Sequence, residues 1–172
     1  MSGVTSFRTL ILLACCLAPV AAQAAIINLY TSLDGSQEVP TNATLGTGTA
    51  TVTFDDVSNL LGWNISFSGL TGAATGAHFH GPAAVGVNAG VQVNIGAISG
   101  LTSPMIGSTT ITGSQATDLL AGLWYINIHT ATFPGGEIRG QVQQQVVPVP
   151  AAFWLLSSGL AALLGWRRPR RA

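Results

Sequence analysis

The segment Ala77-His78-Phe79-His80-Gly81-Pro82-Ala83 is the part of the chain from which the fold is best predicted. Side chains of a strand alternate between its two faces, so His78 and His80 are expected to project together, about 6–7 Å apart along the chain. Phe79 then points to the opposite face. The strand is therefore expected to present two imidazoles on one face and an aromatic ring on the other.

A second strand is predicted from Leu123 to His129. The apolar residues on its face away from His129 are Trp124, Ile126 and Ile128. If this strand lies beside the first one, all three histidines of the chain can converge on one face of the sheet. A site that uses all three histidines therefore requires these two strands to be neighbours.

A metal site is the sharpest chemical hypothesis for these residues. A His-x-His pair on a strand is a sound platform for two ligands, and imidazole suits copper or zinc. The candidate ligands are His78, His80 and His129, with Glu137 as an optional fourth. In the alternative interpretation the histidines hydrogen-bond backbone carbonyls or the nearby turns and so fix the loops. The sequence leaves both interpretations open.

One pair of opposite charges accompanies the histidines. Glu137 and Arg139 lie two residues apart, so they share a strand face. They are expected to form an ion pair that orders the strand, or to bind a polar ligand.

The domain between the two ends of the chain is predicted to be all-β. Short alternating segments follow one another between turns rich in glycine, which indicates an antiparallel sandwich or flattened barrel of seven to eight strands. A short helix is expected from Ser114, as its N-cap, to Ala121. The expected strands are Ile26–Leu33, Thr47–Phe54, Asn59–Ser68, the histidine strand after a loop at 69–76, Val91–Ile95, Ser108–Thr112, Leu123–His129 and Glu137–Gln143.

Residues 1–24 are predicted to be a signal peptide. Arg8 precedes an apolar run from Thr9 to Val20, and Ala22-Gln23-Ala24 offers the small residues of a cleavage site. Lipid attachment at Cys15 is the alternative, because the preceding residues resemble a lipobox. The signal-peptide reading predicts export across the inner membrane.

Residues 147–172 are predicted to be a sorting tail. The motif Val147-Pro148-Val149-Pro150-Ala151 precedes an apolar helix over 151–166 and an arginine cluster over 167–171. This order resembles the PEP-CTERM family of sorting signals, which implies a Gram-negative bacterium and an exosortase-like enzyme as partner. The resemblance also implies transient anchoring in the inner membrane, then release to the cell surface or matrix. The alternative is a plain C-terminal membrane anchor.

The charge of the central domain excludes several function classes. Residues 25–147 hold six acids and one base, Arg139, so the domain carries a net charge of about −5 and contains no lysine. A nucleic-acid partner is therefore not expected, because phosphate binding needs clustered positive charge. Both cysteines, Cys15 and Cys16, belong to the signal peptide, so the exported domain has no disulfide.

Three segments of the central domain resemble, in order, the signatures of the CHRD domain family. They are 33–40 (LDGSQEVP), 77–83 (AHFHGPA) and 129–140 (HTATFPGGEIRG), and the resemblance covers residues 26–143 of a domain spanning 25–146. It implies an immunoglobulin-like β-architecture distantly similar to copper/zinc superoxide dismutase. Dismutase chemistry itself is not expected, because such a site uses more imidazoles than the three present here.

These observations favour a non-enzymatic exported β-domain with a binding or structural role at the cell surface or in an exopolysaccharide or biofilm matrix. Nucleophile and phosphate-binding motifs are missing from the sequence, which argues against an enzyme. The expected partners are the sorting enzyme, exopolysaccharide or surface proteins. The alternative function is that of a secreted or periplasmic copper- or zinc-binding protein that uses the three histidines.

Overall fold

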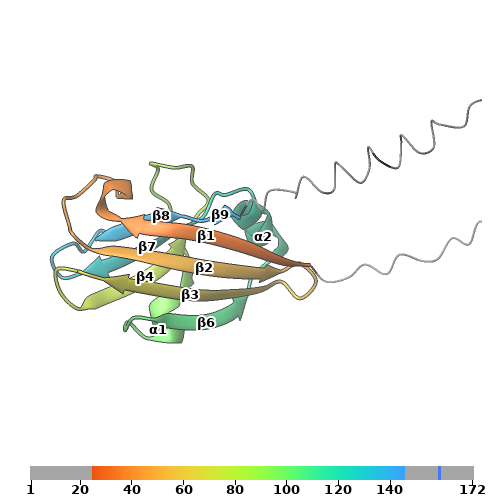
Figure 1. The fold of residues 1–172 in the computed structure, drawn as a ribbon, viewed down its shortest axis with the longest axis horizontal. Helices are drawn as coiled ribbons and strands as arrows, with labels where there is room; N and C mark the ends of the chain where they lie inside the picture. Colours follow the sequence, from red (N-terminus) through yellow and green to blue (C-terminus); the bar gives the residue numbers. More distant parts are fainter. Residues whose placement is uncertain (1–24, 146–158, 160–172) are drawn as a thin grey trace, which may run out of the picture.

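The computed structural model of the protein describes residues 25–145 and Gly159, and the regular secondary structure of this part consists mainly of strands (Figure 1). The predicted signal peptide, the sorting tail and its apolar helix lie outside the described residues, apart from Gly159. In the described part of the chain, no helix has the length and apolar character needed to cross a membrane. The strands are β1 (Ile26–Asp34), β2 (Thr47–Asp55), β3 (Leu60–Ser68), β4 (Ala74–His80), β5 (Val91–Asn94), β6 (Met105–Thr110), β7 (Tyr125–Thr130), β8 (Ile138–Gln141) and β9 (Gln143–Gln144).

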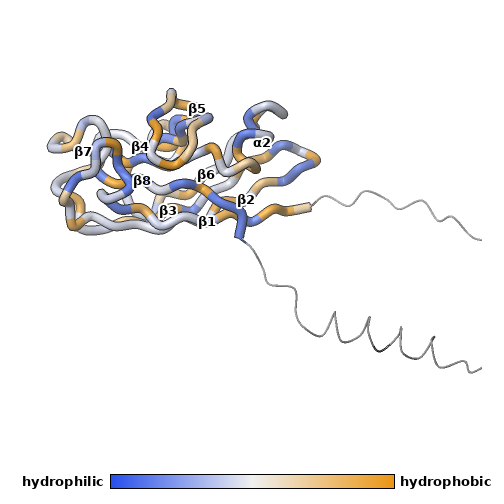
Figure 2. The backbone as a smooth tube through the Cα atoms, turned by 90° about the horizontal axis from the view of Figure 1, so that it is seen from above, coloured by the Kyte–Doolittle hydropathy of each residue, from blue (hydrophilic) through white to orange (hydrophobic). Residues whose placement is uncertain are grey.

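All nine strands form one antiparallel sheet with the order β5-β4-β7-β8-β1-β2-β3-β6, and β9 adds to β1. The predicted all-β antiparallel class is confirmed, but the prediction of a sandwich of seven to eight strands needs correction. Strand β8 pairs with β7 on one side and, through Asp34 and Arg139, with β1 on the other. This link turns two expected sheets into one curled sheet, whose halves face each other as the layers of a sandwich do (Figures 1 and 2).

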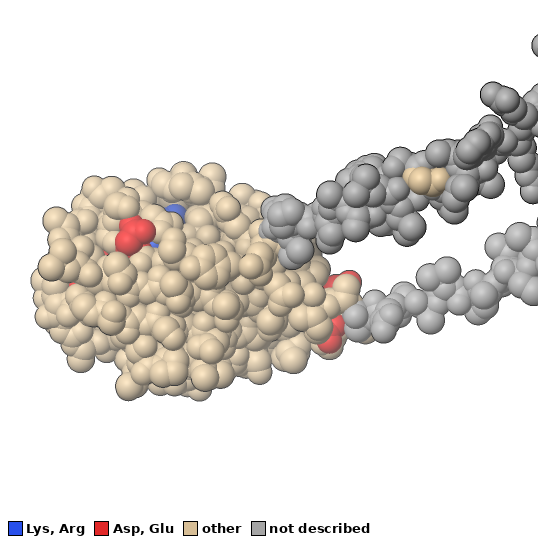
Figure 3. Space-filling view, viewed as in Figure 1, with Lys and Arg blue, Asp and Glu red and all other residues tan. Residues whose placement is uncertain are grey.

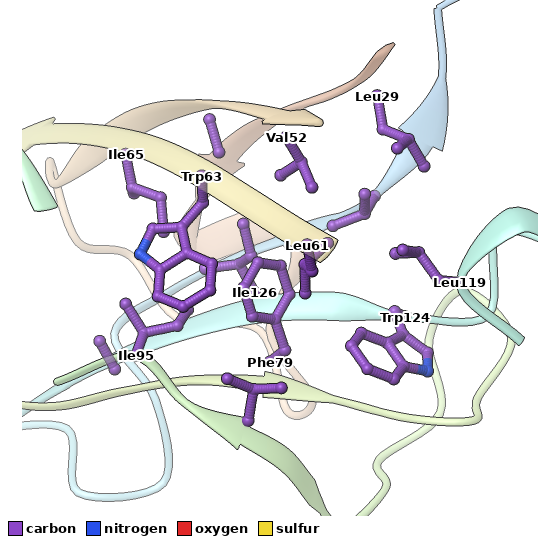
Figure 4. Packing of buried hydrophobic residues seen from close by; sticks show 14 of the residues in the cluster. Leu29, Val52, Leu61, Trp63, Ile65, Phe79, Ile95, Leu119, Trp124 and Ile126 are labelled. Atoms are coloured by element: carbon purple, nitrogen blue, oxygen red, sulfur yellow. The ribbon is translucent and has the colours of Figure 1, made fainter. Parts of the chain in front are cut away.

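The hydrophobic core fills the space between the two halves of the curled sheet (Figure 4). On β2, the alternation of threonines with apolar residues places Ala50, Val52 and Phe54 inside. Trp63 of β3 meets Phe79 of β4 edge to face, with ring centroids 5.6 Å apart. Such a pair adds about 0.5–1.5 kcal/mol to the burial of its rings. The core therefore holds the histidine strand against the opposite half of the sheet.

Within residues 25–145, three short helices occupy connections, and two of them correct the sequence-based expectations. The predicted N-cap Ser114 lies inside α2 (Gly113–Leu120), which is capped by Thr112 because Thr112 and Gln115 form a reciprocal capping box. The expected strand at 91–95 ends one residue early, because the Asn94 side chain accepts from the Ala97 amide and starts α1 (Ile95–Ser99). The third helix, η1 (Gly35–Gln37), is capped by Asp34.

Several strand boundaries also differ from the expectations, since β7 and β8 are Tyr125–Thr130 and Ile138–Gln141 instead of the ranges 123–129 and 137–143. The predicted loop at 69–76 is shorter, since β4 begins at Ala74 and pairs with the end of β7. The predicted strand at 108–112 lies earlier, at Met105–Thr110, where it pairs with β3.

Candidate metal centre

The three histidines meet on the outer face of the sheet, opposite the core. Strands β4 and β7 are antiparallel neighbours, with Gly76 opposite His129 and His78 opposite Asn127. His129 therefore sits diagonally next to His78, and His80 follows on the same face. One nitrogen from each of the three imidazoles lies within 4.8 Å of the others. The adjacency that the sequence left unproven is thus present.

Two backbone carbonyls determine which nitrogen is free in two of the rings. His80 Nδ1 lies 2.9 Å from the carbonyl oxygen of Ala89, and His129 Nδ1 lies 3.0 Å from that of Pro134. A carbonyl oxygen can only accept, so both Nδ1 atoms carry the hydrogen and both Nε2 atoms keep a lone pair. Hydrogen bonds of this kind orient most histidines that bind metals.

Two ring nitrogens, which are hydrogen-bonded to each other, already have the spacing that a metal requires. His78 Nδ1 lies 3.2 Å from His129 Nε2. Two nitrogens bound to one tetrahedral ion at about 2.0–2.1 Å lie roughly 3.3 Å apart, so this pair is almost in place. His80 Nε2 is buried and has no hydrogen-bond partner among the described residues. A purely structural role for the histidines explains the carbonyl contacts but leaves this nitrogen without a function.

The surroundings keep the three imidazoles neutral. Burial lowers the pKa of His78, and the neighbouring His129 and His80 lower it further. Burial also lowers the pKa values of His80 and His129, against the hydrogen bonds to Ala89 and Pro134, which raise them. A metal ion binds the neutral imidazole, so lowered pKa values reduce competition from protons.

Gly76 makes room for the cluster. A Cβ added at Gly76 would lie 3.2 Å from His78 Cε1 and 3.3 Å from His129 Cδ2. A larger residue there would push on both rings at once. The glycine that made this part of the chain look like a loop is therefore a requirement of the site.

The histidines belong to a larger polar layer on the outer face of β4, β7 and β8, which the sequence did not reveal. Its members are His78, His80, Tyr125, Asn127, His129, Arg139 and Gln141, and it lies beneath the loop segments 35–42, 81–90 and 131–136. The Tyr125 ring stacks on His80, with centroids 5.0 Å apart and planes 5° from parallel. The guanidinium carbon of Arg139 lies 3.4 Å from the centre of the same Tyr125 ring. The alternation of Tyr125, Asn127 and His129 along β7 was the signal that could have identified this layer.

Loop 81–90 is fastened to the layer by polar contacts. Arg139 donates to the carbonyl oxygen of Val87 at 2.8 Å and to Asn88 Oδ1 at 3.0 Å. The Ala89 amide donates to the Tyr125 hydroxyl at 3.0 Å. The loop that carries the carbonyl partner of His80 is therefore held from below by two residues of the layer.

Glu137, the optional fourth ligand, lies outside the cluster of three histidines. Its fully buried carboxylate accepts hydrogen bonds from the hydroxyls of Thr44, Thr71 and Thr130 and from the Thr71 amide. Burial alone would raise the pKa of Glu137, but these hydrogen bonds outweigh it and the pKa lies below its ordinary value. The carboxylate is thus committed to the threonines, and the ligand set reduces to three imidazoles.

Arg139 does not form the expected pair with Glu137. The carboxylate whose charge acts on Arg139 is that of Glu38, in the segment 35–42, while Glu137 is occupied by its threonines. Glu38 and Arg139 are both buried, with 4% and 1% of their surfaces exposed. The sequence gave no indication that the segment 35–42, which carries Glu38, folds over the polar layer.

Chemically, the arrangement offers three neutral nitrogen donors with no anionic ligand. Three protein ligands leave at least one coordination position of a four-coordinate ion for water or a small molecule. Late first-row transition metals are the ions that imidazole donors favour, and copper binds more tightly than zinc in the general affinity order.

Comparison with known proteins adds one finding. The model of the CHRD domain family matches residues 29–142, which include both histidine strands and all the loops above the polar layer. No curated protein and no solved structure matches the chain.

Proposed function

The chain belongs to the CHRD domain family, and from this premise we propose that its domain binds one copper or zinc ion through His78, His80 and His129. The observation that supports this proposal best is the convergence of one nitrogen from each ring within 4.8 Å. The unpartnered Nε2 of His80 adds to it, because a buried polar atom without a partner is costly. Metal binding gives that nitrogen a partner.

The proposed ligand set uses the orientation of each ring. His80 and His129 would bind through Nε2, since their Nδ1 atoms donate to carbonyls. His78 Nδ1 is the nitrogen nearest to His129 Nε2, so it would bind after its hydrogen moves to Nε2. The ion would then tie β4 to β7 and, through Ala89 and Pro134, to two of the loops above them.

We also propose that the domain works outside the cytosol, without catalysing a reaction. The sequence of residues 1–24 and 147–172 supports export and sorting to the cell envelope or matrix. Deletion of residues 151–172 tests this part of the proposal, and accumulation of the same processed form at the surface would contradict it. The absence of cysteine from residues 25–145 leaves imidazole nitrogen as the natural donor for a metal in that setting.

Metal binding is tested by loading the purified full chain, in mild detergent, with copper or zinc and measuring bound metal and affinity. One equivalent per chain is expected. Replacing any one histidine by alanine should weaken binding by more than the roughly 10–100-fold that follows the loss of an outer hydrogen-bond partner. Thr51→Ala, on the exposed face of β2, serves as the matched control and should bind like the wild type.

The result that would overturn the proposal is equally definite. Less than a stoichiometric amount of copper and zinc on the repleted wild type, with the fold intact by circular dichroism, excludes the site. Equal binding by the wild type and by a chain that lacks all three histidines excludes it as well.

A further inference from the structure

Two buried oxygen atoms beside the candidate metal centre have no hydrogen-bond partner in residues 25–145. They are Oε1 of Glu38 and Oδ1 of Asn127, whose side chains are 4% and 3% exposed. Both atoms border the same small space, because a Cβ added at Gly136 would press on each of them. Gly136 also has φ +137°, which side chains with a Cβ rarely adopt, so no side chain can fill that space. Two unpaired acceptors facing one space are unfavourable unless a hydrogen lies between them.

The orientation of the Asn127 amide is set by its other neighbours. Asn127 Nδ2 donates to Glu38 Oε2 at 3.3 Å and to the carbonyl oxygen of Gly135 at 3.4 Å. The carbonyl can only accept, so exchanging the amide nitrogen and oxygen would place two acceptors together. Asn127 Oδ1 therefore needs a hydrogen-bond donor in the space that it shares with Glu38 Oε1. The Arg139 guanidinium does not supply it, since Asn127 Oδ1 has no hydrogen-bond partner among the described residues and the bonds of Arg139 go to Val87 and Asn88.

We infer that Glu38 is a neutral carboxylic acid in the folded protein at mildly acidic pH, and that its hydrogen joins Glu38 to Asn127 Oδ1. The amide and the acid then form a reciprocal pair, with Asn127 Nδ2 donating to the other oxygen of Glu38. Burial supports this state, because it raises the pKa of Glu38 to about 7 although Arg139, the Val39 amide and Asn127 act to lower it.

Charged neighbours do not change this conclusion. Arg139 on β8 is the group whose charge acts on Glu38, and it favours the ionised form without outweighing burial. The other titratable groups on the elements around Glu38 are Asp34 at the end of β1, His78 and His80 on β4, Tyr125 and His129 on β7, and Glu137 before β8.

The pair makes Glu38 a positioning residue for His129, a consequence that rests on the proposed function. Asn127 contacts the carbonyl of Gly135, and the adjacent carbonyl of Pro134 accepts from His129 Nδ1. Glu38 thus connects the segment 35–42, across Asn127, to the loop that orients a proposed ligand. Loss of the hydrogen leaves two acceptors facing each other and loosens that connection.

The acid is tested by comparing the wild type with Glu38→Gln in the metal-free full chain over pH 5–8. Glutamine imitates the neutral acid, because its amide can donate to Asn127 Oδ1 at every pH. The stability that the neutral acid gives is complete below the ordinary glutamate pKa of 4.5 and is lost as the pH rises through about 7. The wild type should therefore lose stability relative to Glu38→Gln across this range, by on the order of a hundredfold in the unfolding equilibrium constant.

The opposite sign would overturn the inference. If Glu38 is ionised and paired with Arg139, the wild type gains stability over Glu38→Gln as the pH rises. The infrared band of a protonated carboxyl gives a direct second measurement. It should be present in the wild type at pH 6 and missing from Glu38→Gln, and its absence from both proteins contradicts the assignment.

The positioning role is tested by metal affinity at pH 6. Glu38→Ala should weaken binding by about tenfold or more, and Glu38→Gln should restore it to near the wild-type value. Equal weakening by both variants shows that charge acts instead of the hydrogen bond, and overturns the role. If no variant and no wild type binds metal, the proposed function fails, while the pH comparison still decides the state of Glu38.

Discussion

The inner faces of the two halves of the sheet are alike in burial and polarity, whereas their outer faces differ. Inside, both halves carry apolar residues that are almost completely buried. Outside, the half built from β1, β2, β3 and β6 is exposed, as the threonines of β2 show at 47, 49, 51 and 53. On the half built from β4, β7 and β8, the outward residues Asn127, Arg139 and Gln141 are 3%, 1% and 8% exposed.

The difference arises from the loops and not from the strands. Loop segments 35–42, 81–90 and 131–136 cover the second half and supply hydrogen-bond partners to its polar layer. Over the first half, residues 25–145 place no such loop on the threonines of β2, and the surface that Figure 3 shows carries few charged side chains. A polar side chain that faces outward from a strand is therefore exposed to water in one half and hydrogen-bonded beneath loops in the other.

The largest effect is expected from Arg139→Ala, which removes the fastening of loop 81–90. The change deletes the hydrogen bonds to Val87 and Asn88 and uncovers the Tyr125 ring. Hydrogen bonds made by a charged group contribute about 1.5–3 kcal/mol each, so losing both should lower the unfolding free energy by about 3–5 kcal/mol. Urea unfolding measures this cost, and a loss below about 1 kcal/mol would mean that the cover does not depend on Arg139.

A smaller loss is expected when Glu137 is replaced by glutamine. The variant keeps the shape of the side chain but weakens the hydrogen bonds from three threonines, and bonds to a charged group contribute about 1.5–3 kcal/mol. Because the pKa of Glu137 is lowered by folding, its stabilisation is present above the ordinary value of 4.5 and disappears as the pH falls through the lower folded value. The difference between wild type and Glu137→Gln should therefore shrink in acid.

Asp55→Asn is the control on the other half. Asp55 also accepts local hydrogen bonds, from the amides of Val57 and Ser58, but it lies in a hairpin beside solvent. Its replacement should cost clearly less than that of Glu137 under the same conditions. Equal losses for the two acids would remove the distinction between covered and uncovered positions.

The sequence predicted the strands well because their alternation is a local property. The threonines of β2 lie on its exposed face, and the apolar residues Leu61, Trp63 and Ile65 of β3 lie on its buried face, as the alternation in the sequence indicates. Convergence of the three histidines followed from the same rule once β4 and β7 were neighbours. Both predictions needed only the rule that side chains alternate between the two faces of a strand.

The remaining features depend on contacts between distant segments, which no local pattern encodes. Glu38 folds over the layer because Asn127 and Arg139 are partners on other strands. Glu137 was assigned to the metal site, yet threonines at 44 and 71, far away in the sequence, take its oxygens. The single curled sheet likewise depends on the pairing of β8 with β1.

Gly76→Ala should affect the proposed site more than the fold. The new methyl group presses on His78 and His129, which must shift by a few tenths of an ångström. We expect copper affinity to fall by about tenfold, which corresponds to ~1.4 kcal/mol, because ligand geometry is disturbed. Gly62→Ala on the exposed face of β3 meets only the Thr53 hydroxyl and should leave copper affinity unchanged. Equal affinities for the two alanine variants would show that the rings adjust without cost.

The smallest effect is expected from Thr51→Val, in the middle of the uncovered half. Thr51 is exposed and lies between Tyr30 and Asn64 on neighbouring strands, where its hydroxyl is free to bond with water. Valine keeps the branched shape that a strand favours, so the unfolding free energy should change by less than about 0.5 kcal/mol. Thr130→Val makes the same chemical change under the cover, where the hydroxyl donates to Glu137, and should cost about 1–3 kcal/mol. If the two valine variants were equally stable, the outer faces of the halves would not differ in the way that burial and hydrogen bonding indicate.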